Sequence, residues 1–487
     1  MRDKLKELTK DTAIYGISTI VGRLFGFILI PFLSQFLSKS QMGVYGNIYS
    51  YIAFLNIIYI YGMDAAFLKY TSVAEEKEKK AVFSTPFIFV FVTSLIFSVL
   101  FTLNVDSIGV WIKTPPHYTF LLNYVGVILF FDTLALIPFA HLRLQRKAKK
   151  FAVIKIVNIT INLTMNIVLI GFFNYDIDAI FISNAAASII TFIILIPDIY
   201  EFLSPKIDKA LLKKMLYFGL PYLPAALSAT VVQVIDRPLL TYLTDDATVG
   251  VYTTNYKLGI SMMLYVGMFQ YAWQPFFLNN AKEKNAKEIF SKVLTAFVLV
   301  GSVIVVILTL FINDIVAIPL SESRTLIDAK FWDGLVIVPV ILFAYLLHGM
   351  YINFQAGIYI EEKTKYFPLI TGAGAVVNIL VNLWLIPILG LMGAALATLA
   401  SYLLMALLLF NVVQKFFYIK YEYKKILLTL MLTSLVIIGF YLLFYNNSAD
   451  LIYRLLILLG FSVLIFTLKI INKDELAIIF KMLKLRK

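Results

Sequence analysis

The sequence contains no cysteine and only 3 histidines. The absence of cysteine excludes disulfide frameworks, thiolate zinc sites, cysteine nucleophiles and thiol redox chemistry. The histidines, His117, His141 and His348, are far apart and match no metal-ligand spacing. A Walker lysine motif is also missing, so nothing in the sequence indicates ATP hydrolysis.

Charged residues are scarce as well. They make up 15% of the chain, against about 25% in ordinary soluble domains, while hydrophobic residues make up 61%. A soluble chain of 487 residues could not bury that much apolar surface. The composition therefore predicts an integral membrane protein, for which the location of the basic residues matters more than the net charge of +13.

Fourteen apolar runs are long enough to cross about 30 Å of hydrocarbon as helices. They are too long and too continuously apolar for the alternating strands of a membrane β-barrel. The sequence thus predicts an all-α polytopic membrane protein. The predicted spans are Thr12–Leu37, Gly43–Phe67, Val82–Leu103, Phe120–Ala140, Val153–Phe173, Ala179–Ile196, Phe218–Tyr242, Gly250–Phe276, Ile289–Phe311, Gly334–Ala356, Tyr366–Leu385, Gly390–Phe410, Ile426–Phe444 and Leu451–Ile471.

Basic residues in the connections predict the orientation. With the N-terminus inside, 34 of the 42 Lys and Arg residues fall in inside segments, 5 in outside segments and 3 within spans. This bias predicts that both termini are cytoplasmic. No connection exceeds about 20 residues, so no soluble catalytic domain is expected between spans.

Two motifs recur at similar offsets. Gly43-Val-Tyr45 opens the second span and Gly250-Val-Tyr252 opens the eighth, 207 residues later; Asn162-x3-Asn166 in the fifth span matches Asn378-x3-Asn382 in the eleventh, 216 residues later. Chance similarity of apolar sequences is the alternative. A duplication predicts two six-helix lobes of the same orientation, related by a pseudo-two-fold axis along the membrane normal.

This duplication divides the chain into four parts. Residues 1–200 form an N-lobe and residues 201–415 a C-lobe. Residues 416–472 form an extra helix pair, and residues 473–487 a basic tail, which either lies on the inner leaflet as an interfacial helix or is solvated.

Three basic residues fall inside predicted spans, where each is costly unless it is paired or faces water. They are Arg23 near the middle of the first span, Arg237 in the seventh and Lys257 in the eighth. Together they would suit a cavity for an anionic cargo. The alternatives are structural pairing of Arg23, snorkelling of Lys257 to the interface, and neutralisation of Arg237 by the adjacent Asp236.

Two further features concern the membrane interior. Asp132, deep in the fourth span, is a candidate for a cavity or ion-coupling role. Pro221, Pro224 and Pro238 all fall in or beside the seventh span, which predicts a bent or discontinuous helix, as transporters use at binding sites.

Several motifs together resemble the oligosaccharide flippases of the polysaccharide-transporter (Wzx-type) family, within the multidrug/oligosaccharidyl-lipid/polysaccharide exporter (MOP) superfamily. They are Asp11-Thr-Ala-Ile-Tyr-Gly16 followed by Gly22-Arg23, Met42-Gly-Val-Tyr-Gly46, and Asn378-x3-Asn382-Leu-Trp-Leu-Ile-Pro387. The resemblance covers essentially the whole chain. It implies a transporter rather than an enzyme. Such a transporter moves an undecaprenyl-pyrophosphate-linked oligosaccharide across the bacterial cytoplasmic (inner) membrane by alternating access. The oligosaccharide is used for O-antigen, capsule or exopolysaccharide synthesis.

The resemblance also implies a cation site. A sodium site of lipid II flippases matches Asp236, Asn378, Asn382 and Thr398 here, although Asn382 replaces an acidic residue often seen at that position. The expected cofactors are therefore none beyond Na⁺ or, in the rival proposal, H⁺ coupled through Asp132 or Asp236. The expected ligands are the lipid-linked oligosaccharide and membrane lipids, and the expected protein partners are a polysaccharide polymerase or glycosyltransferases. The protein is expected to be a monomer and to bind no nucleic acid.

Other functions compete with this one. A lipid II flippase is the neighbouring alternative. A multidrug exporter is less favoured, because the first span has Arg23 and no acidic residue. A membrane glycan polymerase would need larger outside loops than Asn313–Asp333, and a scaffold without transport would leave the charges in the spans unexplained.

Overall fold

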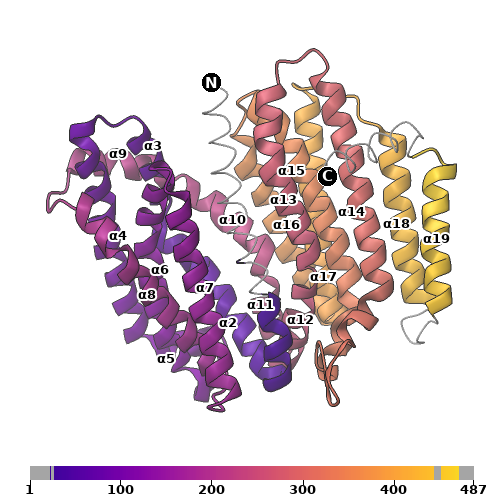
Figure 1. Ribbon diagram of the computed structural model, residues 1–487, viewed down its shortest axis with the longest axis horizontal. Helices are drawn as coiled ribbons and strands as arrows, with labels where there is room; N and C mark the ends of the chain where they lie inside the picture. Colours follow the sequence, from indigo (N-terminus) through magenta and orange to yellow (C-terminus); the bar gives the residue numbers. More distant parts are fainter. Residues whose placement is uncertain (1–21, 23–26, 444–450, 471–487) are drawn as a thin grey trace.

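The computed structural model describes residue 22, residues 27–443 and residues 451–470 of the chain. Apart from one short β-hairpin, all regular structure in this part is helical (Figure 1). Arg23, the start of the first predicted span and the basic tail 473–487 lie outside the described residues. The prediction of an all-α polytopic fold is confirmed.

The first half contains the first six predicted spans. Its elements are the helix Phe27–Phe36, α2 (Lys39–Ile60), α3 (Met63–Ser72), η1 (Glu76–Glu78), α4 (Lys79–Leu103), α5 (Val105–Trp111), η2 (Pro116–Tyr118), α6 (Leu121–Leu144), α7 (Ala148–Gly171) and α8 (Asp178–Phe202).

The second half and the terminal pair contain the other eight. Their elements are α9 (Lys209–Gly219), α10 (Tyr222–Val234), α11 (Asp236–Leu243), α12 (Asp246–Leu258), α13 (Ile260–Asn280), α14 (Ala286–Val316), the antiparallel strands β1 (Pro319–Ser321) and β2 (Arg324–Thr325), η3 (Ala329–Ile337), α15 (Val338–Ile360), α16 (Tyr366–Leu389), α17 (Leu391–Gln414), α18 (Tyr423–Leu443) and α19 (Leu451–Thr467).

Within the described residues, nine helices are long and apolar enough to cross a membrane, or eleven if two bent helix pairs each count as one span. The remaining predicted spans correspond to shorter or interrupted helices: the helix Phe27–Phe36, the pair α12 and α13, and α19. Within the described residues each predicted span therefore has at least a partial helical counterpart, which agrees with a plan of about fourteen spans.

The seventh span is broken as predicted. The axes of α9 and α10 differ by 41°, and the break lies at Leu220 and Pro221. A second interruption at Ile235 separates α10 from α11. Proline removes a backbone donor and crowds the preceding turn, so it favours such breaks.

The second span is also bent by 41°, which the sequence did not indicate by a proline. Between α2 and α3 the chain passes through Tyr61 and Gly62, both with positive φ, and Gly62 lies against the end of α9. A Cβ on Gly62 would lie 2.3 Å from the carbonyl oxygen of Gly219. The breaks in the second and seventh spans thus pack directly on each other.

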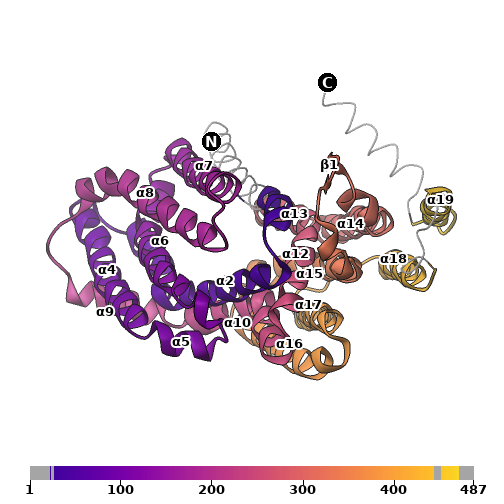
Figure 2. The same cartoon turned by 90° about the horizontal axis from the view of Figure 1, so that it is seen from below.

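The helices form two lobes that approach closely at one end and diverge towards the other (Figures 1 and 2). Helices α2 to α8 make up the first lobe, and α12 to α17 the second. Helix α9, the first helix of the predicted C-lobe segment, packs on α3 and α4, and α10 then crosses to the second lobe. Helices α18 and α19 lie beside α14 at the far edge of the second lobe.

Between the lobes, the main contact joins α2 to α12. Ser38 caps α2 and Asp245 caps α12, so the two helices begin at the same point of the repeat. A Cβ on Gly43 would lie 1.8 Å from the Asp246 carbonyl oxygen, and one on Gly250 would lie 1.8 Å from the Lys39 carbonyl oxygen. Only glycine permits this reciprocal backbone contact, which we call the glycine seam.

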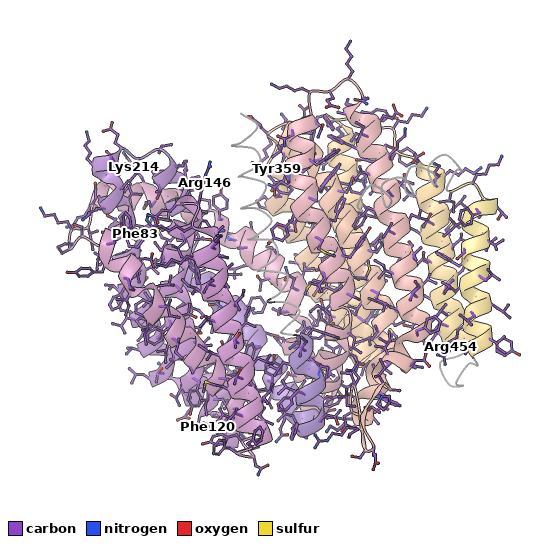
Figure 3. All side chains as sticks on the ribbon, in the orientation of Figure 1. Phe83, Phe120, Arg146, Lys214, Tyr359 and Arg454 are labelled. Carbon is purple, nitrogen blue, oxygen red and sulfur yellow. The ribbon has the colours of Figure 1, made fainter. Side chains whose placement is uncertain are left out.

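The connections alternate between the two ends of the bundle (Figure 3). Arg146 and Lys214 lie at the end where the lobes diverge, and Phe120 and Arg454 lie at the end with the glycine seam. We name these the inner and outer ends, after the predicted orientation.

Reporter fusions test that orientation. Fusions after Lys113 and Glu322 should report the periplasm, and fusions after Lys150 and Lys284 the cytoplasm, because basic residues concentrate in the latter connections. Alkaline phosphatase and fluorescent protein activities measure the two locations. A cytoplasmic signal at Lys113 would overturn the orientation.

The glycine seam predicts a conformational effect of Gly43→Leu. The new side chain cannot fit against the Asp246 backbone, so the lobes should separate at the outer end. Because the chain has no cysteine, spin labels can be placed on cysteines introduced at Asp106 and Glu322, and pulsed electron resonance should then report a longer distance.

The matched control is Gly439→Leu in α18, because no described atom outside its own helical surroundings lies within 4 Å of a Cβ at that position. The control should leave the label distance unchanged. Should Gly43→Leu prevent folding, Gly43→Ala probes the same contact. An intact Gly43 variant with an unaltered distance would contradict the role of the seam.

Candidate functional site

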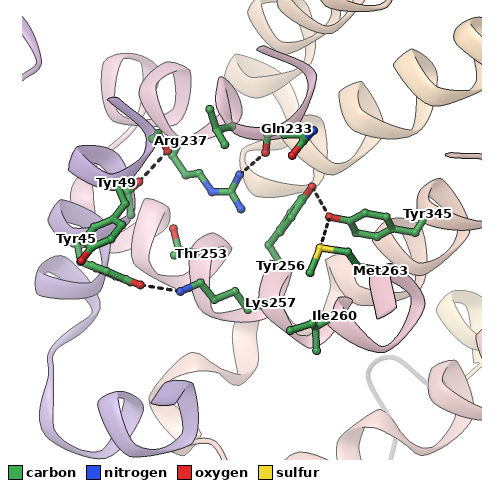
Figure 4. A pocket seen from close by; sticks show the side chains of 13 residues that line it. Tyr45, Tyr49, Gln233, Arg237, Thr253, Tyr256, Lys257, Ile260, Met263 and Tyr345 are labelled. Atoms are coloured by element: carbon green, nitrogen blue, oxygen red, sulfur yellow. Dashed lines mark hydrogen bonds between the residues drawn. The ribbon is translucent and has the colours of Figure 1, made fainter. Parts of the chain in front are cut away.

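A cavity of about 270 Å³ lies between the lobes, directly on the inner side of the glycine seam (Figure 4). One wall comes from α2 and the other from α10 to α13 and α15. We call it the cationic cavity, because it holds two basic side chains. Its lining residues are Tyr45, Gly46, Tyr49, Ser50, Gln233, Val234, Arg237, Thr253, Tyr256, Lys257, Ile260, Met263 and Tyr345.

Arg237 enters this cavity from α11. Its guanidinium donates a hydrogen bond of 2.8 Å to the carbonyl oxygen of Gln233 and lies 4.2 Å from the ring centre of Tyr256. In the described part of the chain, no carboxylate lies within ion-pair distance of Arg237. The cation–π contact offsets part of the cost of burial, and no carboxylate of the described residues is in direct contact with the guanidinium.

Lys257 enters the cavity from α12. Its Nζ donates a hydrogen bond of 2.8 Å to the Tyr45 hydroxyl of the opposite lobe and lies 4.7 Å from the centre of that ring. It forms no ion pair with a carboxylate of the described residues. In Figure 4 both basic side chains point into the space enclosed by Tyr45, Tyr49 and Tyr256. Two cations in one cavity, neither in direct contact with a carboxylate of the described residues, attract a polyanion such as a pyrophosphate.

Asp236 precedes Arg237 in the sequence but points the other way, into the second lobe. Its carboxylate accepts hydrogen bonds from the Tyr252 hydroxyl at 2.6 Å, the Thr398 hydroxyl at 3.1 Å and the Asn382 amide at 3.2 Å. The adjacent pair therefore does not form the local ion pair that the sequence left open. We call this buried group the Asp236 cluster.

The four residues matched to a cation site, Asp236, Asn378, Asn382 and Thr398, come together in this cluster, and all four are fully buried. The Asn382 Nδ2 also donates to the Asn378 Oδ1 at 2.9 Å, which leaves Asn382 Oδ1 and Asn378 Nδ2 without hydrogen-bond partners. Tyr252 was not predicted as a member, although it belongs to the recurring Gly-Val-Tyr motif.

The donor set of the Asp236 cluster suits a small hard cation. Carboxylate, hydroxyl and amide oxygens are the ligands that such ions prefer. The Asn382 amide nitrogen now bridges Asp236 and Asn378, and a half-turn of this amide would bring its unpartnered oxygen to the same place. The described residues contain no group of three or more His, Asp or Glu that could hold a metal ion, so a multi-carboxylate site for a divalent ion is not found there.

Asp132 belongs to neither site. It is in α6 of the first lobe, where Ser188 of α8 donates a hydrogen bond of 2.6 Å to its carboxylate. It lines neither the cationic cavity nor the Asp236 cluster. Arg23, the third predicted cation, lies outside the described residues.

Most of the neutral lining of the cationic cavity was not predicted from the sequence. Its tyrosines follow the repeat: Tyr45 and Tyr252 belong to the recurring Gly-Val-Tyr motifs, and Tyr49 and Tyr256 come four residues after each of them. The structure places three of these four rings around the cavity and the fourth, Tyr252, on Asp236. Repeated tyrosines beside buried cations were the available signal.

Comparisons with known proteins agree with this architecture. The chain is similar to the structure of the lipid II flippase MurJ in an inward closed conformation, with a TM-score of 0.74 and 16% identity over 94% of this chain and 100% of that chain. It is similar to a multidrug resistance MATE family transporter of the MOP superfamily in an inward-facing conformation, with a TM-score of 0.65 and 14% identity over 81% of this chain and 94% of that chain.

A mutant of the Vibrio cholerae MATE transporter VcmN gives a TM-score of 0.59 and 14% identity over 84% of this chain and 96% of that chain. At these identities the likeness establishes the fold. A search of curated protein sequences found no significant match.

The family follows from the sequence itself. A family model described as "Polysaccharide biosynthesis protein" matches residues 8–281, which is more than half of the chain. This match and the fold shared with MurJ and MATE transporters lead to one conclusion: the chain belongs to the polysaccharide biosynthesis protein family and has the multi-pass membrane fold of a MOP-superfamily transporter.

Proposed function

We propose that the protein is a flippase that moves an undecaprenyl-pyrophosphate-linked oligosaccharide from the inner to the outer leaflet of the bacterial cytoplasmic membrane. The observation that carries the proposal is the cationic cavity, where Arg237 and Lys257 have no carboxylate partner among the described residues. A cargo with a pyrophosphate would bring negative charge into direct contact with both cations. The family and the fold are those of transporters, which agrees with this proposal.

Alternating access provides the mechanism for such a carrier. The glycine seam closes the outer end of the cationic cavity, so the pyrophosphate would enter from the inner end, where the lobes diverge. Lys257 bonds to Tyr45 across the cavity, so an entering anion would compete for this lysine and weaken one contact between the lobes. Binding of the cargo would in this way favour separation at the outer end.

A lipid II flippase is the second candidate, because the chain is similar in structure to MurJ. Both cargoes carry an undecaprenyl pyrophosphate, so the two cations serve either function equally. The two candidate functions differ only in the glycan that the lipid carries, so the recognised glycan decides between them. We expect the protein to act as a monomer, next to a polymerase or glycosyltransferases of the same polysaccharide.

Lys257→Met should reduce translocation by about tenfold to a hundredfold, the loss expected for one charge-assisted hydrogen bond. Arg237→Lys should retain part of the activity, because an ammonium keeps the charge and loses the bidentate geometry. The measurement is the flux of undecaprenyl-pyrophosphate oligosaccharide, and separately of lipid II, in proteoliposomes. Arg23→Ala tests the third predicted cation in the same assay.

The matched control is Lys213→Met, which removes an exposed lysine of α9 far from the cationic cavity. It should transport at the wild-type rate. Wild-type flux of both cargoes by Lys257→Met would refute the proposed cation role. Transport of lipid II alone would assign the second function.

Ion coupling is the other part of the proposal. The Asp236 cluster would hold Na⁺ through Asp236, Asn378, Asn382 and Thr398, and the bound charge would replace hydrogen bonds that now cross between α11, α16 and α17. A coupling ion of this kind would link the packing of the broken seventh span to the ion gradient. Proton coupling through Asp132 or Asp236 is the rival.

Flux should rise with an imposed sodium gradient, and Asp236→Asn should abolish that rise because the only carboxylate of the cluster is lost. Asp132→Asn, at the first-lobe residue of the rival proposal, should keep the sodium response. The measurement is flux at fixed pH with sodium replaced by potassium. Indifference to sodium together with a response to pH, lost in Asp132→Asn, would favour the rival.

A further inference from the structure

A second cavity of about 320 Å³ lies within the second lobe. Helices α10, α13, α15, α16 and α17 all contribute to its wall. Three residues, Gln233, Met263 and Tyr345, line both this cavity and the cationic cavity. The two spaces therefore adjoin each other at these three side chains.

The chemistry of the second cavity differs from that of the first. Among the described residues that line it, none is Asp, Glu, Lys or Arg. We call it the neutral cavity. Its polar lining consists of amide, hydroxyl and imidazole groups, from Gln233, Gln270, Gln355, Thr371, His348, Tyr345, Tyr351 and Tyr402. A glutamine amide both donates and accepts hydrogen bonds, as sugar hydroxyl and acetamido groups do.

Aromatic rings form one side of the neutral cavity. The ring centres of His348 and Tyr402 are 4.6 Å apart, and those of Tyr345 and Tyr402 are 6.1 Å apart. The hydroxyl groups of Tyr345 and Tyr256 lie 3.2 Å from each other, so this wall continues into the cationic cavity. Packed rings with a few polar groups give a rigid surface for the apolar face of a ring-shaped ligand.

From this arrangement we infer that the neutral cavity is the subsite for the sugar joined directly to the pyrophosphate, and that this sugar is an uncharged hexose or N-acetylhexosamine. The inference rests on the proposed function, because the pyrophosphate must occupy the cationic cavity. No Lys or Arg lines the neutral cavity, so a uronic acid there would bury a carboxylate without a cation in direct contact, at a high cost in free energy. The neutral cavity thus selects the first sugar by its charge, while the cationic cavity binds the pyrophosphate that all such lipids carry.

Three probes separate the two cavities: undecaprenyl pyrophosphate, the same lipid carrying N-acetylglucosamine, and the same lipid carrying glucuronic acid. Equilibrium binding to the full-length protein in detergent micelles is measured for each. The wild-type protein should bind the N-acetylglucosamine lipid more tightly than undecaprenyl pyrophosphate, and the glucuronic acid lipid less tightly. Gln270→Leu and Gln355→Leu should each weaken binding of the N-acetylglucosamine lipid by roughly tenfold, the effect of one lost hydrogen bond. Neither variant should weaken binding of the other two probes.

Two matched variants complete the test. Lys257→Met should weaken all three probes, because it removes a cation that faces the pyrophosphate. Gln355→Lys should raise the affinity for the glucuronic acid lipid relative to the N-acetylglucosamine lipid, since it places a cation in the neutral cavity. Gln270 is exposed to the cavity, so its substitution should leave thermal stability unchanged.

The outcomes distinguish failure of the inference from failure of the proposed function. If the wild-type protein binds none of the three lipids, the proposed function fails. If it binds undecaprenyl pyrophosphate and the glutamine variants weaken all probes equally, or none, the neutral cavity is not a sugar subsite. A wild-type preference for the glucuronic acid lipid would also overturn the inference.

Discussion

The backbone contact between α2 and α12 is the interaction on which the arrangement of the lobes depends. Gly43 and Gly250 bring two capped helix starts together at the outer end, and each glycine faces a backbone carbonyl of the other helix. The cationic cavity begins directly behind this contact, where Gly46 and Thr253 form part of its lining. A side chain at either glycine would separate the walls of the cavity. The shape of the cationic cavity therefore depends on the close packing at the seam.

The breaks in the seventh span place two adjacent charged side chains in different surroundings. Asp236 and Arg237 begin α11 directly after the interruption at Ile235, and their side chains leave the helix in different directions. The carboxylate takes three hydrogen bonds inside the second lobe, while the guanidinium faces the cavity between the lobes. Two adjacent charges thus face two separate sites, which suits the proposed coupling of an ion to a cargo.

Much of this architecture could be predicted from the sequence. Apolar runs and prolines predicted the helices and the broken seventh span, and the charges inside spans indicated Arg237 and Lys257. The family resemblance predicted the proximity of Asp236, Asn378, Asn382 and Thr398. Their spacing in the sequence alone does not indicate that α11, α16 and α17 meet. The bend at Gly62 and the neutral cavity were not predictable: the first depends on a contact with Gly219, and the second on glutamines that carry no charge to single them out.

The repeat also constrains how the protein is made. Gly43 and Gly250 are 207 residues apart, so at a synthesis rate of roughly 5–20 residues per second the ribosome needs about 10–40 s to complete the second partner of the seam after the first. During that interval α2 has a bare glycine face and no α12 to cover it. Small residues on a lone helix in lipid invite association with other helices. The nascent first half is therefore the species most exposed to mispairing, and membrane insertases or chaperones would have to act within that window.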